Sequence, residues 1–425
     1  MKIIKTIALM MSVLSITAGL CACNGTVDPA DTTEPVTDSV TTDAATTEPD
    51  DSGEKEKGYY GLEFERPIIV AAYGGNGSAY SRMYPLKDGR LICAWPSSDG
   101  GKRCMKAVFS EDDGKTWSKI RVLFYGEDQT KTLANVDIIQ LESGQVLMAY
   151  RSNDRNASQG YSSIRIHASD DNCETFYPHS IVCEMQQTGL KDGVSWGLWE
   201  PDFCYVNGKL TCFFAIGKTV YEKPVIPSTD IFEWNEAEKK WVQSHYTSND
   251  TDKTDRNGMP IVDKLSTGGY LMSVETKRFY ASRGSTLLPY LLYSEDGVDW
   301  KGVTGCFFPD NTASGGSPFW VELPDGRIVV AFQTDEDVEG TMFDTGDDSC
   351  KVTKIVVLKD GVDITKAHSW DWNESYDPFN TTPGKFANWP GMFIHNDYLY
   401  LYTSTNDPAG GCISLVRAYV GDMKK

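Results

Sequence analysis

Apolar runs of five residues recur along the chain about sixty residues apart, and a short turn precedes each run. The turn usually reads Leu-x-x-Gly, which tolerates a positive φ, and the run after it is rich in β-branched and aromatic residues. The runs are LICAW from residue 91, VLMAY from 146, LTCFF from 210, YLMSV from 270, IVVAF from 328 and YLYLY from 398. Six hairpins at this period predict an all-β chain folded as a six-bladed β-propeller.

A second phrase recurs between the hairpins. Ser110–Trp117 reads SEDDGKTW and matches the Asp-box pattern S-x-D-x-G-x-T-W, while Ser169–Phe176 and Ser294–Trp300 are weaker copies. In such a turn the Asp side chain accepts backbone N–H groups, Gly supplies a positive φ, and the aromatic ring fills the gap between strands. We therefore expect the aspartates Asp112, Asp171 and Asp296 to be turn residues rather than catalytic ones. The combined repeats resemble those of the sialidase-like six-bladed propellers.

The first 57 residues differ in composition from the rest. Residues 1–22 have two lysines, an apolar stretch and small residues, which is typical of a secretion signal. Leu20-Cys21-Ala22-Cys23 resembles a bacterial lipobox, so we expect cleavage before a lipidated Cys23; an ordinary cleavable signal peptide is the alternative. Residues 23–57 are rich in Thr, Asp, Glu and Pro, which predicts a disordered tether. Residues 58–425 should form the propeller, and the protein is expected at the cell surface or secreted.

The charge and the metal-binding residue types narrow the range of functions. The formal net charge of −20 and the lack of a basic patch argue against a nucleic-acid partner. The nine cysteines after Cys23 form no CxxC pair and the five histidines are scattered, so we expect neither a metal site nor a cofactor. Contact with a membrane is expected only through the lipid anchor.

Polar and aromatic residues recur at one register of the repeats. In a propeller the first strand of each blade starts beside the central channel, so residues seven to twelve positions before each repeat glycine should face the axis. These residues are Arg82, Asn135, Asp137, Trp199, Glu200, Arg256, Asn257, Ser317 and Trp389. A second set lies seven residues after the repeat glycine and comprises Arg151, Glu275 and Gln333. Carboxylates, arginines and tryptophans around one opening predict a site that binds and cleaves a sugar.

Several segments at these positions resemble the exo-acting arabinanases of glycoside hydrolase family 93, over most of residues 58–425. The segments are YSRMYPLKDG from residue 80, ANVDIIQLESGQVLMAYRSND from 134, GLWEPDF from 197, RNGMP from 256, SVE from 273 and FANWPGM from 386. The resemblance implies a retaining mechanism and puts the two catalytic glutamates on Glu200 and Glu275, about 5 Å apart. We expect Glu200 to be the nucleophile and Glu275 the acid/base, with the reverse assignment as the alternative. Packing gives no evident reason for the Trp-Glu-Pro sequence at 199–201.

The resemblance also implies substrate contacts. Arginines are expected to orient sugar hydroxyls and amides to add polar contacts. Tryptophans are expected to stack on sugar rings, with packing between the blades as the alternative for each of them. The arginines are Arg82, Arg151 and Arg256; the tryptophans are Trp196, Trp199 and Trp389; the amides are Asn135, Asn257 and Gln333. Asn257 stands where the family usually has an acidic residue. This difference affects the prediction of the sugar and its linkage more than the prediction of a hydrolase.

The sequence thus predicts an exo-acting hydrolase of α-1,5-linked arabinan or arabino-oligosaccharides from plant cell walls. A sialidase is one alternative, because it would share the fold and the boxes, and Arg66-Pro67-Ile68 is similar to the start of the sialidase arginine motif. The remainder of that motif does not align. The other alternative is a noncatalytic glycan-binding propeller, and an intact pair at Glu200 and Glu275 argues against it.

Overall fold

A computed structural model describes residues 58–423 in part. Its gaps are residues 75–78, 129–130, 154–160, 187–193, 221–224, 248–255, 281–283, 304–313, 337–351, 360–361, 367–371 and 408–409. The predicted signal segment, tether and Cys23 lie outside the described residues, as do the side chains of Trp196, Arg256 and Asn257. The described part of the chain contains no helix long and apolar enough to cross a membrane.

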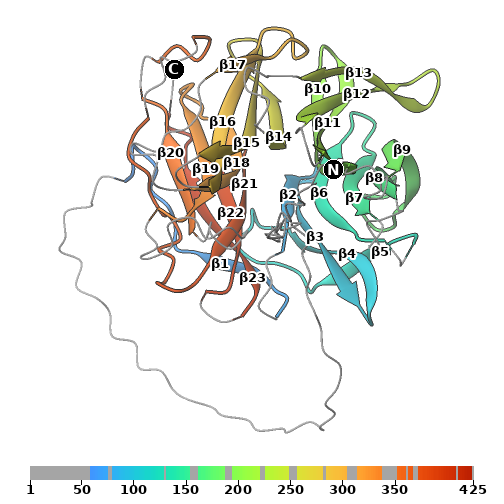
Figure 1. The fold of residues 1–425 in the computed structure, drawn as a ribbon. Helices are drawn as coiled ribbons and strands as arrows, with labels where there is room; N and C mark the ends of the chain where they lie inside the picture. Colours follow the sequence, from blue (N-terminus) through green and yellow to red (C-terminus); the bar gives the residue numbers. More distant parts are fainter. Residues whose placement is uncertain are drawn as a thin grey trace, which may run out of the picture. The chain divides into compact units, whose positions relative to one another are not determined.

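Six antiparallel sheets follow one another along the described chain, as the repeats predict, and each is called a blade here (Figure 1). Blade 1 consists of β2 (Arg82–Pro85), β3 (Leu91–Asp99), β4 (Lys102–Ser110) and β5 (Arg121–Tyr125). Blade 2 consists of β6 (Ala134–Gln140), β7 (Val146–Asn153), β8 (Tyr161–Ser169) and β9 (Tyr177–Gln186). Blade 3 consists of β10 (Val194–Val206), β11 (Lys209–Val220), β12 (Val225–Asn235) and β13 (Lys240–Thr247).

The remaining blades complete a ring. Blade 4 consists of β14 (Arg256–Lys264), β15 (Tyr270–Tyr280), β16 (Gly284–Ser294) and β17 (Lys301–Val303). Blade 5 has three described strands, β18 (Gly315–Glu322), β19 (Ile328–Thr334) and β20 (Val352–Val357). Blade 6 consists of β21 (Ala387–His395), β22 (Tyr398–Thr405), β23 (Cys412–Tyr419) and β1 (Ile68–Ala72). The pairing of β1 with β23 closes the ring, and the inner strands contact one another in the cyclic order β2, β6, β10, β14, β18, β21.

The predicted turns join the first and second strands of the blades. In four of them the repeat glycine has a φ near 90°, at Gly89, Gly144, Gly268 and Gly326, which an L side chain rarely adopts. Its N–H bonds to the carbonyl of the turn's first residue, as from Gly89 to Leu86 at 3.0 Å. The requirement for glycine at this position of each turn therefore explains why Leu-x-x-Gly recurs along the sequence at the spacing of the blades.

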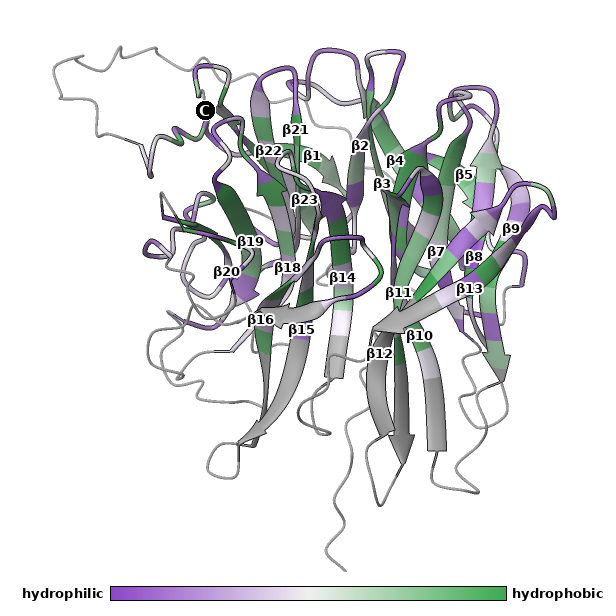
Figure 2. Cartoon of the chain, turned by 90° about the horizontal axis from the view of Figure 1, so that it is seen from above, coloured by the Kyte–Doolittle hydropathy of each residue, from purple (hydrophilic) through white to green (hydrophobic). Residues whose placement is uncertain are grey.

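The second strands are continuous apolar runs because both of their faces are buried. Leu91, Cys93 and Trp95 of β3 pack against blade 6, while Ile92 and Ala94 pack against blade 2. A cluster of this kind lies between each pair of neighbouring blades. Figure 2 shows hydrophobic residues concentrated along strands and hydrophilic residues in the connecting loops. The packing of blade on blade is thus what stabilises the ring.

The three box turns have the hydrogen bonds expected of them. Asp112 accepts the N–H of Thr116, Asp171 that of Thr175 and Asp296 that of Asp299, each at 2.8 Å. The side-chain and backbone hydrogen bonds from Thr175 lower the pKa of Asp171 to about 2. Cys173 takes the glycine position of its turn with a φ of 68°.

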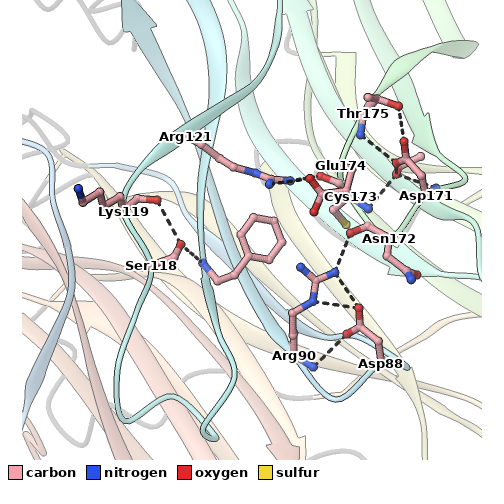
Figure 3. A network of polar contacts seen from close by, with 12 residues as sticks. Asp88, Arg90, Ser118, Lys119, Arg121, Asp171, Asn172, Cys173, Glu174 and Thr175 are labelled. Carbon is pink, nitrogen blue, oxygen red and sulfur yellow. Dashed lines mark hydrogen bonds and ion pairs between the residues drawn. The ribbon is translucent and has the colours of Figure 1, made fainter.

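The turn around Asp171 also links two blades. Arg90 of blade 1 donates to the carbonyl of Asn172 at 2.8 Å and is itself held by Asp88 (Figure 3). Arg121 of the same blade reaches Glu174 at 3.1 Å. The turn around Asp171 therefore ties blade 2 to blade 1.

Candidate active site

The inner strand of five blades carries a β-bulge at the same register position. The pairing shifts between Ala134 and Asp137, Trp199 and Asp202, Gly258 and Ile261, Gly316 and Phe319, and Asn388 and Gly391. The first bulged residue is in each case left-handed: Asn135 (φ 50°), Glu200 (46°), Met259 (50°), Ser317 (50°) and Trp389 (60°). A bulge re-aims a side chain, and such conformations in non-glycine residues cluster at functional sites.

Proline follows the left-handed residue in four of these bulges. The prolines are Pro201, Pro260, Pro318 and Pro390. Proline has no N–H, so it leaves no unpaired donor where the ladder is interrupted. The expectation that packing gives no reason for Trp-Glu-Pro is therefore wrong: residue-Pro is the bulge signature of these blades. What is particular to blade 3 is the glutamate itself.

Two members of the second polar set, Glu275 and Gln333, reach the bulges of the next blade. Glu275 Oε2 accepts the N–H of Ser317 at 3.1 Å, and Gln333 Oε1 accepts the N–H of Trp389 at 2.9 Å. Glu275 pairs with Gly258 and Gln333 with Gly316, so each side chain lies opposite its own blade's bulge. We call these two contacts the bulge clamps. Their regular spacing in the sequence thus has a structural cause.

The two predicted catalytic glutamates are connected through neighbouring bulges. Glu200 Oε2 lies 3.4 Å from the N–H nitrogen of Met259, and Met259 Sδ lies 3.2 Å from Ser317 Oγ. Ser317 in turn donates its N–H to Glu275. Glu200 is 8% exposed and Glu275 is 7% exposed. Hence both carboxylates belong to one continuous set of contacts across blades 3, 4 and 5.

Blade 1 contributes a residue that the sequence reasoning missed. Tyr80 precedes Gly89 by nine residues, as Asn135 precedes Gly144, and this spacing is the signal that would have found it. Arg82 Nη2 donates to the Tyr80 hydroxyl at 2.5 Å, and its guanidinium lies over the rings of Tyr80 and Phe319. Arg82, only 3% exposed, is therefore packed against Tyr80 and Phe319 rather than open to solvent.

Two further carboxylates fasten the blades together. Asp137 accepts the N–H of Phe203 and Asp202 that of Val262, each at 2.8 Å across a blade boundary. Burial raises the pKa of Asp137 to about 6, and the charge of Arg82 opposes that rise. Burial and the charge of Asp137 raise the pKa of Asp202 well above its usual range. Asp137, expected to face the axis, is thus an inter-blade fastener.

The other predicted residues lie around the same end of the inner strands. Arg151 is half-buried and pairs with Ala134 just before the first bulge. Asn135 is 8% exposed, and its Oδ1 has no hydrogen-bond partner among the described residues. Trp199 is half-buried against Gly197, where a Cβ would lie 2.3 Å from the indole. Within the described residues no three His, Cys, Asp or Glu side chains are grouped so as to hold a metal ion.

Solved structures of similar fold include an arabinanase and an arabinofuranosidase. The α-L-arabinanase of Penicillium chrysogenum, solved with arabinobiose, is 17% identical; the match covers 85% of this chain and 99% of that one, with a TM-score of 0.62. The family 93 α-L-arabinofuranosidase of Fusarium graminearum, also solved with arabinobiose, is 19% identical, with the same coverage and a TM-score of 0.61.

A sialidase shares the fold less closely. The NanB sialidase of Streptococcus pneumoniae is 11% identical over 85% of this chain and 71% of that one, with a TM-score of 0.52. No protein-family model matches the sequence, and no curated protein matches it. At these identities the likeness establishes the fold alone. The chain therefore has the sialidase-like six-bladed propeller fold, and it resembles in fold the arabinanases of glycoside hydrolase family 93.

Proposed function

We propose that this protein is a retaining, exo-acting glycoside hydrolase that acts on α-1,5-linked arabinan or arabino-oligosaccharides. One observation carries the proposal: Glu200 and Glu275 come from neighbouring blades, are almost fully buried, and are joined through Met259 and Ser317. Buried carboxylates are costly unless they are paired or serve a function. A pair of carboxyl groups flanking a glycosidic bond is what most glycoside hydrolases use.

In the proposed mechanism Glu200 attacks the anomeric carbon and Glu275 protonates the leaving oxygen. Glu275 then removes a proton from the water that hydrolyses the glycosyl-enzyme ester, which restores both groups. The N–H of Ser317 occupies Oε2 of Glu275, so Oε1 is the oxygen assigned to proton transfer. The N–H of Met259 holds Glu200 in the same way. Fixed geometry of this kind lowers the activation barrier, because the catalytic groups are already aligned before the reaction begins.

The aromatic and polar residues support a sugar as the substrate. Trp389 and Trp199 are half-buried, and an indole ring is a surface on which a sugar ring can stack. Asn135 offers a polar side chain at the equivalent bulge of blade 2. The arabinose unit is suggested by the two similar structures that were solved with arabinobiose.

A sialidase is the second candidate, because sialidases use a Tyr nucleophile paired with a carboxylate. In this chain the negative charge of Glu200 acts on Tyr80. Burial and that charge both raise the pKa of Tyr80. The position of Arg82 argues against it. A sialidase binds the substrate carboxylate through arginines, whereas the Arg82 guanidinium is bonded to Tyr80 and to the carbonyl of Ser81. Arabinan therefore remains the favoured substrate.

The test is incubation of the purified protein with debranched linear arabinan, arabinoxylan and sialyllactose, followed by analysis of the released sugars. We expect arabinobiose from linear arabinan and no product from the other two. Release of sialic acid would overturn the proposal in favour of a sialidase. Binding of arabinan without any turnover, unchanged in Glu275→Gln, would instead identify a noncatalytic glycan-binding propeller.

A further inference from the structure

Arg82 is a buried cation that contacts a phenol hydroxyl and two aromatic rings. Its Nη2 donates to the hydroxyl of Tyr80 at 2.5 Å, and its Nη1 donates to the carbonyl of Ser81 at 3.0 Å. The guanidinium carbon lies 4.3 Å from the ring centre of Tyr80 and 5.3 Å from that of Phe319 in blade 5. The ion pairs found among the described residues do not include Arg82. The contacts of Arg82 therefore fix both the ring and the hydroxyl of Tyr80.

Packing alone does not explain why blade 1 has this pair. Both Arg82 and Tyr80 are buried. A buried charge is costly unless it is paired and hydrogen-bonded, and apolar residues of similar volume often pack as stably. What the pair adds is a fixed ring, because a cation over the face of the phenol and a hydrogen bond at its edge together restrict its orientation.

The ring that Arg82 fixes lies against Trp389 of blade 6. The centres of the Tyr80 and Trp389 rings are 5.7 Å apart, and their planes are tilted by 50°. The backbone of Trp389 is held separately, by the 2.9 Å hydrogen bond from its N–H to Gln333 of blade 5. Trp389 is half-buried, and its φ of 60° is a conformation that clusters at functional sites when a residue other than glycine adopts it. Trp389 is thus held at its backbone from blade 5 and at its indole from blade 1.

We propose that Arg82 and Tyr80 are positioning residues that hold the indole of Trp389 in the orientation in which it binds a sugar ring. This inference rests on the proposed function, because it concerns the same substrate site. An aromatic ring that is already fixed loses less conformational entropy when a ligand binds to it. Arg82 then acts on substrate binding through Tyr80 and Trp389, rather than by the direct contact with sugar hydroxyls that the sequence suggests.

The test is a double-mutant cycle between Tyr80→Leu and Trp389→Leu, read as KM and kcat on linear arabino-oligosaccharides. Tyr80→Leu removes the ring that supports the indole. We expect KM to rise about 3- to 10-fold, the effect of losing one aromatic pair, while kcat stays within about twofold. Trp389→Leu should raise KM by at least as much. Adding Tyr80→Leu to Trp389→Leu should change KM by less than about twofold, because no indole remains to be positioned.

Two variants of Arg82 test the contact between Arg82 and Tyr80. Arg82→Met keeps an unbranched side chain and removes the charge and the donors, so KM should rise by about 2- to 5-fold. Arg82→Lys keeps a cation and a donor, so its KM should lie between those of Arg82→Met and the wild type. Tyr80→Phe keeps the ring and loses only the bond to Arg82, so it replaces Tyr80→Leu if that variant does not fold. It should raise KM as Arg82→Met does, and wild-type KM in both would overturn the role of this pair.

Tyr402→Leu is the matched control. Tyr402 is also buried at the boundary between blades 6 and 1, and its hydroxyl accepts the N–H of Met83 at 3.1 Å. We expect this variant to melt at a lower temperature with an unchanged KM. An unchanged KM in Tyr80→Leu, additive effects in the double variant, or an equal rise in Tyr402→Leu would overturn the inference and leave the proposed function intact. Lack of arabinan turnover in the wild type would overturn the proposed function and this inference with it.

Discussion

Glu275 and Gln333 occupy the same place in two neighbouring blades. Each lies seven residues after its repeat glycine, opposite the glycine that precedes its blade's bulge. Each accepts the N–H of the bulged residue in the next blade, at 3.1 Å for Glu275 and 2.9 Å for Gln333. The two clamps therefore differ in one atom of the head group while their backbone contacts are equivalent.

The difference separates what the fold needs from what the chemistry needs. A neutral amide at position 333 holds its bulge as well as a carboxylate does, so the fold does not require an acid at position 275. Burying a charge costs more than burying an amide. The presence of a carboxylate at position 275 is therefore best explained by the reaction we propose. The amide at position 333 is explained by the structural hydrogen bond that Gln333 accepts from Trp389.

The largest effect is expected for Glu275→Gln. The amide keeps the bond to Ser317, as Gln333 does with Trp389, but it cannot transfer a proton. We expect arabinan turnover to fall by about 10²- to 10⁴-fold with an unchanged melting temperature. Glu275→Ala, which also loses the clamp, should in addition lose about 1–3 kcal/mol of unfolding free energy. Equal destabilisation of both variants, or full activity in Glu275→Gln, would break the comparison.

A smaller and different effect is expected for Gln333→Ala. The variant leaves the N–H of Trp389 without its acceptor, which should lower the unfolding free energy by about 1–3 kcal/mol. Trp389 would then be held less firmly, so KM should rise more than kcat falls. Steady-state kinetics and denaturant unfolding measure the two effects. A loss of kcat as large as that in Glu275→Gln would mean that the two clamps share one role.

Asp137→Asn extends the comparison to a fastener that is a carboxylate. The amide oxygen can still accept from Phe203, so the fold should persist. The pKa of Asp137 is raised from 3.8 to about 6, so the stability linked to its protonation is full below pH 3.8 and is lost as the pH rises to about 6. The wild type should therefore lose stability between pH 3.8 and about 6 while Asp137→Asn does not, so the melting temperature of Asp137→Asn minus that of the wild type should increase with pH over this range. A constant difference between the two proteins would contradict the assignment.

The smallest effect is expected for Asp171→Asn, with the opposite pH dependence. Both carboxylate oxygens of Asp171 accept hydrogen bonds from Thr175. In Asp171→Asn the side-chain NH2 group would replace one of these oxygens and would face a hydrogen-bond donor of Thr175. The pKa of Asp171 is lowered to about 2, so its contribution is present above pH 3.8 and is lost as the pH falls toward 2. The difference in melting temperature from the wild type should shrink over that range. A difference that grows instead would show that the turn does not depend on the charge.

The fold was predictable because its signals are local. The glycines of the repeat turns and the runs such as LICAW depend on residues close in sequence, and each run is continuous because neighbouring blades cover both faces. The six-bladed propeller predicted from them is confirmed. The spacing that singled out Glu275 and Gln333 is equally regular, since both arise from the same clamp.

The details of the site were less predictable because they depend on contacts between blades. Asp137 bonds to Phe203 and Asp202 to Val262 across a blade boundary, and no local pattern distinguishes such a fastener from a catalytic acid. The bulges follow from the register of pairing, although the recurring proline after four left-handed residues was a readable sign. Tyr80 lacked that sign, because Ser81 follows it where four of the other blades have proline.

The most direct test of the proposed pair is the stereochemistry of the product. Proton NMR of the reaction on linear arabino-oligosaccharides, recorded before the released sugar mutarotates, reports the anomeric configuration first formed. Two glutamates that act as nucleophile and acid/base across one bond predict a product with the α configuration of the substrate. A product that first appears in the β configuration would contradict the account, because it would mean that water attacks directly and neither glutamate forms an ester.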